Sequence, residues 1–217
     1  MKYPSVLAVF LVLLPVPAHA ADVFKSVQFY GQTNMIYEQS SGLGVTAWAS
    51  MRFANIDPTF LFLGIGPSLT KKDEHGRVLH SFDITLGVNA YTSYDVAGSP
   101  SWDFAPVIDL HASGCIEKLF LYANPEWGDM FGANHNLSLY GLAAYMFFDG
   151  MFMFGLETED LMMKGVSDVF SMGPALIVPV GEKVLFAVSV LFSNEALIPG
   201  LSKPDALFQI RLFLLDY

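Results

Sequence analysis

The chain has few of the features that usually hold an exported fold together or bind a charged partner. Cys115 is the only cysteine in 217 residues, so no internal disulfide can form. Charged residues make up only 15% of the chain, and 21 acidic residues outnumber 11 Lys and Arg, which gives a net charge of −10. Nucleic acid is therefore not an expected partner, because its phosphates need basic side chains. The fold must be held by packing and backbone hydrogen bonds.

Residues 1–20 have the pattern of a secretory signal peptide. Lys2 precedes an apolar run from Val6 to Val16, and Ala18 and Ala20 form the small-x-small site that signal peptidase accepts. Cleavage there leaves residues 21–217 as a single domain. The alternative is a membrane anchor, but the run is shorter than the roughly 20 residues that a spanning helix needs, and prolines interrupt it.

The mature part lacks a long uninterrupted apolar run, although 53% of the chain is hydrophobic. The closest approach to a spanning helix is Leu137 to Leu156, but Asp149 and Gly150 interrupt it. Asp-Gly between apolar runs is a strong hairpin signal, so two strands are predicted here, with a helical hairpin as the alternative. An exported chain this apolar, without spanning helices, satisfies its backbone in a bilayer only as a closed barrel.

Alternation of apolar with small or polar residues recurs along the chain, as strands with two different faces require. The clearest example is Val78 to Tyr91, and a hairpin around Gly181 is a second. Both parities are apolar around Asp149, which predicts that part of the interior is apolar. We therefore predict an all-β fold, an antiparallel transmembrane β-barrel of about ten strands, with eight or twelve as alternatives.

The strand count depends on Gly114 to Ala123, which either continues the preceding strand through a bulge or turns into a separate strand. A count of about ten results if Asp103 to Ala123 is one strand, and this even number places both chain ends in the periplasm. The turns at Asp149 and Gly181 are then periplasmic. The segments Asn124 to Asn136 and Glu157 to Asp168 are predicted to be loops.

The last strand, Ala206 to Tyr217, resembles the C-terminal signal of bacterial outer-membrane barrels, a final aromatic residue preceded by alternating hydrophobic ones. Three residues fit this spacing: Tyr217, Leu215 and Phe213. Arg211 and Gln209 depart from it, because the pattern has apolar residues there. The resemblance implies the outer membrane as location, with membrane lipids and the barrel assembly machinery as partners. A lipid-facing arginine near the midplane costs about 2 to 4 kcal/mol, so Arg211 is predicted to face the lumen.

Polar residues on the inward parities are predicted to line the lumen. This set is Gln32, Asn34, Arg52, Asp83, Asn89, Asp109, His111 and Arg211. Within it, Arg52 and Asp83 are candidate ion-pair partners. The histidines lack the spacing of a metal site, so neither a metal nor another cofactor is expected.

Asp109, His111 and Ser113 share one face of a predicted strand and form the one candidate catalytic group. Outer-membrane lipid hydrolases use Ser and His on barrel strands, and the chain is loosely similar to them. However, same-face neighbours have Cα atoms roughly 6.5 to 7 Å apart, which leaves the Ser-His contact to another strand. The leading hypothesis is a non-enzymatic narrow channel for small or hydrophobic solutes, or a structural envelope protein. A lipid-modifying hydrolase and a soluble periplasmic lipocalin-like binder are the alternatives.

Overall fold

The computed structural model describes residues 23–38, 41–54, 57–74, 78–94, 100–129, 136–163, 168–180, 184–194 and 206–216. Within these ranges the chain forms strands and one short 3₁₀ turn, and no α-helix. The elements are β1 (Val23–Glu38), β2 (Leu43–Ala54), β3 (Asp57–Lys72), β4 (Val78–Tyr94), β5 (Pro100–Ile116), β6 (Leu119–Gly128), β7 (Asn136–Phe147), η1 (Phe148–Gly150), β8 (Phe152–Met163), β9 (Val169–Pro179), β10 (Val184–Ser193) and β11 (Ala206–Asp216). The predicted signal peptide lies outside the described residues.

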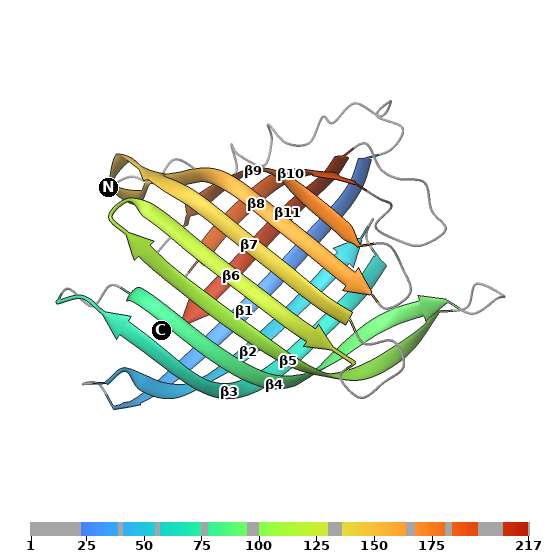
Figure 1. The fold of residues 1–217 in the computed structure, drawn as a ribbon, viewed down its shortest axis with the longest axis horizontal. Helices are drawn as coiled ribbons and strands as arrows, with labels where there is room; N and C mark the ends of the chain where they lie inside the picture. Colours follow the sequence, from blue (N-terminus) through green and yellow to red (C-terminus); the bar gives the residue numbers. More distant parts are fainter. Residues whose placement is uncertain are drawn as a thin grey trace.

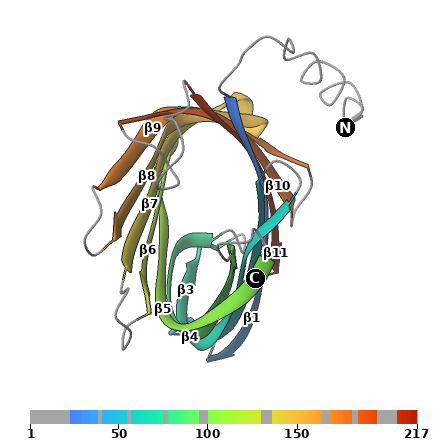
Figure 2. The same cartoon turned by 90° about the vertical axis from the view of Figure 1, so that its right-hand side faces the viewer.

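The strands close into one barrel (Figures 1 and 2). Strands that follow one another in sequence pair antiparallel, whereas β1 and β11 close the barrel with a parallel pairing, from Val23 opposite Ala206 to Thr33 opposite Asp216. Closure gives each described strand two hydrogen-bonded neighbours, so none of them presents a free edge. Among the described residues, no helix is long and apolar enough to cross a membrane.

The predicted all-β barrel is confirmed, but the predicted strand count of about ten and the fully antiparallel closure are wrong. Gly114 does not form a bulge. Instead β5 continues to Ile116, and the chain turns at Glu117 and Lys118 into β6. Glu117 has a φ of 54°, a left-handed conformation that a non-glycine residue rarely adopts, so the sequence carries no turn signal at this position. The additional strand makes the number odd, which forces the first and last strands to be parallel.

The two ends of the barrel differ in their connections. At one end, residues 117–118 join β5 to β6 and residues 148–151 join β7 to β8, and we call this the tight-turn end. The longest connections, residues 129–135 and 194–205, belong to the opposite end, which we call the long-loop end. The described chain begins at the long-loop end, where β1 starts, and stops at the tight-turn end, where β11 finishes (Figure 1). The prediction that both chain ends lie together is therefore wrong.

Apolar side chains point outward from the barrel wall. In β4, for example, exposure alternates along the chain. Ile84 and Leu86 are exposed, whereas the preceding Asp83 and the intervening Thr85 are fully buried. Every described strand contributes at least one exposed large apolar side chain. Representatives from β1 to β11 are Phe29, Met51, Leu63, Leu86, Phe104, Leu121, Leu139, Phe154, Leu176, Phe192 and Leu214. The barrel therefore carries an apolar belt around its outside.

The interior near the tight-turn end is also apolar. Its buried residues come from β7 to β10 and are Leu142, Ala144, Met153, Ala175, Ile177 and Ala187. Phe154 and Leu156 on the same hairpin are exposed on the outer face. Both parities around Asp149 are apolar because one faces this core and the other faces outward.

Candidate functional site in the barrel lumen

The rest of the lumen holds two groups of polar side chains, each defined here by its residues. The acid-rich cluster lies on β1, β2, β4, β5 and β6 and consists of Gln32, Thr46, Trp48, Asp83, Asn89, Asp109, His111, Tyr122, Asn124 and Glu126. The ion-pair cluster lies on β2, β8, β10 and β11 and consists of Arg52, Glu157, Glu159, Ser189, Gln209 and Arg211.

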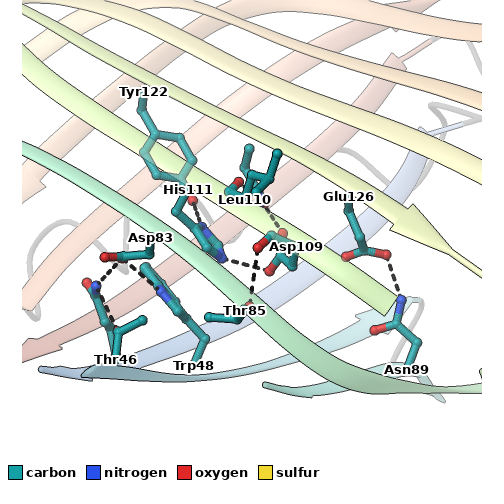
Figure 3. A network of polar contacts seen from close by, with 12 residues as sticks. Thr46, Trp48, Asp83, Thr85, Asn89, Asp109, Leu110, His111, Tyr122 and Glu126 are labelled. Carbon is teal, nitrogen blue, oxygen red and sulfur yellow. Dashed lines mark hydrogen bonds and ion pairs between the residues drawn. The ribbon is translucent and has the colours of Figure 1, made fainter. Parts of the chain in front are cut away.

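Asp83 of the acid-rich cluster is held by neutral donors from two other strands. Asp83 lies on β4 and is fully buried. Its Oδ2 accepts hydrogen bonds from Gln32 Nε2 at 2.8 Å and from Trp48 Nε1 at 3.2 Å (Figure 3). Gln32 Nε2 also donates to Thr46 Oγ1 at 3.3 Å. Two N–H groups thus replace part of the water that this carboxylate loses on burial.

His111 occupies the centre of the acid-rich cluster. Its Nε2 lies 2.7 Å from Asp109 Oδ2, and its Nδ1 lies 2.6 Å from the Tyr122 hydroxyl oxygen. Its ring stacks on Trp48 with a centroid distance of 3.9 Å and an interplanar angle of 10°. The second oxygen of Asp109, Oδ1, accepts a short hydrogen bond from Asn124 Nδ2. Both oxygens of this carboxylate and both ring nitrogens are therefore engaged within the protein.

Ser113 does not complete a catalytic arrangement with these residues. It is half-buried on β5, two residues beyond His111. Both imidazole nitrogens already contact other groups, one the Asp109 carboxylate and the other the Tyr122 hydroxyl. A serine nucleophile needs one of those nitrogens as its base. The contacts hold Asp109 and His111 in one hydrogen-bonded network, and none of the contacts described joins Ser113 to His111.

Glu126 extends the acid-rich cluster toward the long-loop end. Its Oε1 accepts a hydrogen bond from Asn89 Nδ2 at 2.6 Å. Asp109 lies between the other two acids, within electrostatic reach of both Asp83 and Glu126. Figure 3 shows the three carboxylates following one another along the barrel wall. His111 is the one basic side chain in this cluster, so its carboxylates outnumber its potential cations.

The ion-pair cluster is balanced in charge, with two arginines and two glutamates. Arg211 is 1% exposed and donates through Nη1 to Glu157 Oε1 and through Nη2 to Glu159 Oε1. Arg52 Nη2 reaches the same Glu159 oxygen at 3.2 Å. Because β2 and β8 lie on opposite sides of the closed strand order, the Arg52–Glu159 ion pair crosses the lumen.

Neutral donors and an aromatic ring complete this cluster. Ser189 Oγ donates to Glu157 Oε1 at 3.2 Å, and Gln209 Nε2 donates to Glu159 Oε2 at 3.0 Å. The Arg211 guanidinium carbon lies 4.7 Å from the centroid of the Tyr140 ring, a cation–π contact. Tyr140 in turn meets Tyr122 edge-on at 5.5 Å. Tyr140 and Tyr122 thereby join the two clusters.

Most of the polar residues predicted to line the lumen are found inside the barrel. Gln32, Asp83, Asn89, Asp109, His111 and Arg211 are buried there, and Arg52 is half-buried and reaches across the interior. The Asn34 side chain lies outside the described part. The predicted ion pair between Arg52 and Asp83 does not form. Arg52 instead pairs with Glu159, and Asp83 accepts hydrogen bonds from Gln32 and Trp48.

Several lumen residues lie in segments whose sequence predicts loops. Glu157 and Glu159 lie in β8, and Asn124 and Glu126 lie in β6, so these parts of the two loop predictions are wrong. The spacing of Glu157 and Glu159 by two residues, on the parity opposite Phe154 and Leu156, was the available signal. The many acidic residues of segment 157–168 are instead typical of a solvated loop.

No protein-family model matches this chain, and neither a curated protein nor a solved structure matches it. Within the described ranges, no group of three or more His, Cys, Asp or Glu side chains is placed to hold a metal ion.

Proposed function

We propose that this protein is a β-barrel of the bacterial outer membrane that serves as a narrow channel for small solutes. The observation that carries the proposal is the distribution of polarity across the barrel wall. Ile65 and Leu86 on the outside are each 62% exposed, whereas Asp83 and Arg211 on the inside are 0% and 1% exposed. A protein folded in water is expected to show the opposite distribution. Acyl chains around the apolar belt would account for it.

Exposed aromatic side chains at both ends of the apolar belt support a membrane location. Trp102 and Trp127 lie on the outward parities of β5 and β6, near the long-loop end. Tyr145 and Phe147 are exposed near the other end of the wall, where β7 finishes. Membrane barrels carry such aromatic girdles where the hydrocarbon meets the headgroups, because these rings suit a mixed environment. Their separation along the wall marks the two predicted interfaces.

The contacts inside the lumen favour a narrow channel over a general porin. Arg52 and Glu159 meet across the interior, and the Trp48–His111 stack joins β2 to β5. Small barrels are largely filled by their own side chains, so only small solutes could pass between such groups. The 39% exposed side chain of Arg52 shows that solvent reaches the ion-pair cluster.

The odd number of strands is compatible with this function. Single-chain bacterial barrels have even counts, but a mitochondrial porin has an odd one, so a parallel closing pair can exist in a membrane. If short turns face the periplasm, as in barrels of this class, β11 ends on the periplasmic side. Asp216 then lies where the assembly machinery would meet the C-terminal strand.

Fractionation and reconstitution test the proposal. We expect the mature protein in the outer-membrane fraction, soluble only with detergent, and migrating faster on a denaturing gel before heating than after. In planar bilayers it should give small discrete conductance steps. A detergent-free soluble product would overturn the membrane location. A heat-modifiable barrel that never conducts would instead be a structural envelope protein.

A further inference from the structure

We propose that the acid-rich cluster makes the lumen selective for small monovalent cations. Asp83, Asp109 and Glu126 are the successive positions with which such a cation would interact. The inference rests on the proposed channel function and names the class of solute.

The two clusters differ in how their negative charge is compensated. In the ion-pair cluster, Glu157 and Glu159 both contact guanidinium groups. In the acid-rich cluster, the hydrogen bonds to Asp83 and Glu126 come from neutral side chains. His111 contacts Asp109 directly, and no guanidinium is in direct contact with these acids in the described contacts. Removing carboxylates from water is costly unless positive charge replaces the lost hydration. A mobile cation in the lumen would supply that charge.

Buried oxygen atoms without hydrogen-bond partners point to an electropositive guest. They include Gln32 Oε1, Asp83 Oδ1 and Asn89 Oδ1, all on residues at least nine-tenths buried. The amide orientations are fixed by the network, because Gln32 Nε2 donates to Asp83 and Asn89 Nδ2 donates to Glu126. The remaining atoms are thus acceptors enclosed within the cluster. A cation, or the water around it, matches acceptors in a way that an anion cannot.

The spacing of the carboxylates suits passage more than tight retention. No three of the described metal-binding side chain types converge closely enough to chelate one ion. Instead, Asp109 is electrostatically coupled to Asp83 on one side and to Glu126 on the other. Cation channels use acidic side chains at several weak sites, because conduction requires an ion both to enter and to leave. Three positions in sequence along one wall meet that requirement.

Arg52 opposes this selectivity near the long-loop end. Its guanidinium acts electrostatically on Glu126 while it pairs with Glu159 across the lumen. It therefore lowers the local negative potential at the third position. Removing its charge should strengthen the preference for cations, whereas removing a carboxylate should weaken it.

The test measures the reversal potential of the reconstituted mature protein across a planar bilayer with a KCl gradient. We expect the wild type to prefer K⁺ over Cl⁻. Asp83→Asn, Asp109→Asn and Glu126→Gln should each lower the permeability ratio by about fivefold, and Arg52→Gln should raise it. Glu117→Gln is the matched control, because this acid is exposed in the β5–β6 turn. Its ratio should stay at the wild-type value.

Each variant is first checked for heat-modifiable migration, so that only folded barrels are compared. Glu126→Gln keeps the oxygen that accepts from Asn89 and removes only the charge, so it tests the inference even if a buried Asp variant fails to fold. A conducting wild type without K⁺ preference, or one whose ratio is unchanged by Glu126→Gln, would refute cation selectivity while leaving the channel intact. A wild type that is folded but never conducts would refute both cation selectivity and the channel role, while leaving the membrane barrel intact.

Discussion

The ion-pair cluster and the acid-rich cluster occupy the same lumen, but their buried carboxyl groups have different kinds of partner. In the ion-pair cluster, Arg211 contacts two glutamates and closes a balanced network between β8 and β11. In the acid-rich cluster, the Asp83 carboxyl is held by neutral N–H donors from Gln32 and Trp48. The comparison indicates that the first cluster braces the barrel wall and the second leaves a negative potential in the lumen. The following predictions test that division of roles.

The largest effect is expected from Arg211→Met. This change leaves Glu157 and Glu159 buried without their shared guanidinium, which should cost about 3 to 5 kcal/mol of unfolding free energy. Urea-induced unfolding in lipid vesicles, followed by tryptophan fluorescence, measures the loss. A loss below about 1 kcal/mol would show that this cluster is not a brace.

A matched double variant separates lost pairing from lost packing. Adding Glu157→Gln to Arg211→Met removes the carboxylate that was left unpaired, so part of the stability should return. A double-mutant cycle then gives a coupling energy of about 1 to 3 kcal/mol. Strictly additive losses would contradict a direct Arg211–Glu157 interaction.

An intermediate effect is expected from Trp48→Phe in the acid-rich cluster. Phenylalanine keeps an aromatic face for His111 but removes the indole N–H that donates to Asp83. Weakening the support of a buried carboxylate should cost about 1 to 3 kcal/mol in the same unfolding measurement. If the loss exceeded that of Arg211→Met, the roles assigned to the two clusters would be reversed.

A small effect on stability is expected from Asp83→Asn. The amide oxygen can still accept from Gln32 and Trp48, and no arginine loses a partner, so the change should stay within about 1 kcal/mol. The same variant should nevertheless alter ion selectivity. Stability and selectivity are thus predicted to respond to different clusters, and a severe destabilisation here would argue that Asp83 is structural.

The smallest effect is expected from Ser113→Ala, which lies outside both clusters. Its unfolding free energy should change by no more than about 0.5 kcal/mol. Neither the wild type nor this variant is expected to release fatty acid from lipid esters, because both nitrogens of His111 are engaged. Ester release that disappears in Ser113→Ala would establish the hydrolase alternative.

The barrel itself could be predicted from sequence, because each strand has to present an apolar outer face and a different inner one. The same alternation predicts that Asp109 faces inward, and the cost of a lipid-facing arginine predicts this for Arg211; both side chains are buried. The turn at Glu117 was not predictable in the same way, since its left-handed backbone occurs at a residue with no glycine-like signal. That single turn separates β5 from β6, which makes the strand number odd and the closing β1–β11 pair parallel.

The partners of the charged residues could not be predicted, because they depend on how the sheet closes. Arg52 on β2 meets Glu159 on β8, and these residues are brought together only across the completed barrel. The sequence predicts Arg52 and Asp83 as a pair, because both have inward parity and their charges are opposite. Charge and parity select candidates for pairing, whereas strand number, stagger and lumen width decide which of them meet.

The position of the tryptophans relative to lipid tests the central claim most directly. Trp48 faces the lumen, whereas Trp102 and Trp127 are exposed on the outer wall. Variants that keep only Trp48 or only Trp127, with phenylalanine at the other two positions, are reconstituted in vesicles of lipids with brominated acyl chains. The account predicts strong quenching of Trp127 fluorescence and little quenching of Trp48. Equal protection of both, or failure to associate with the vesicles, would contradict a barrel whose apolar belt meets the membrane.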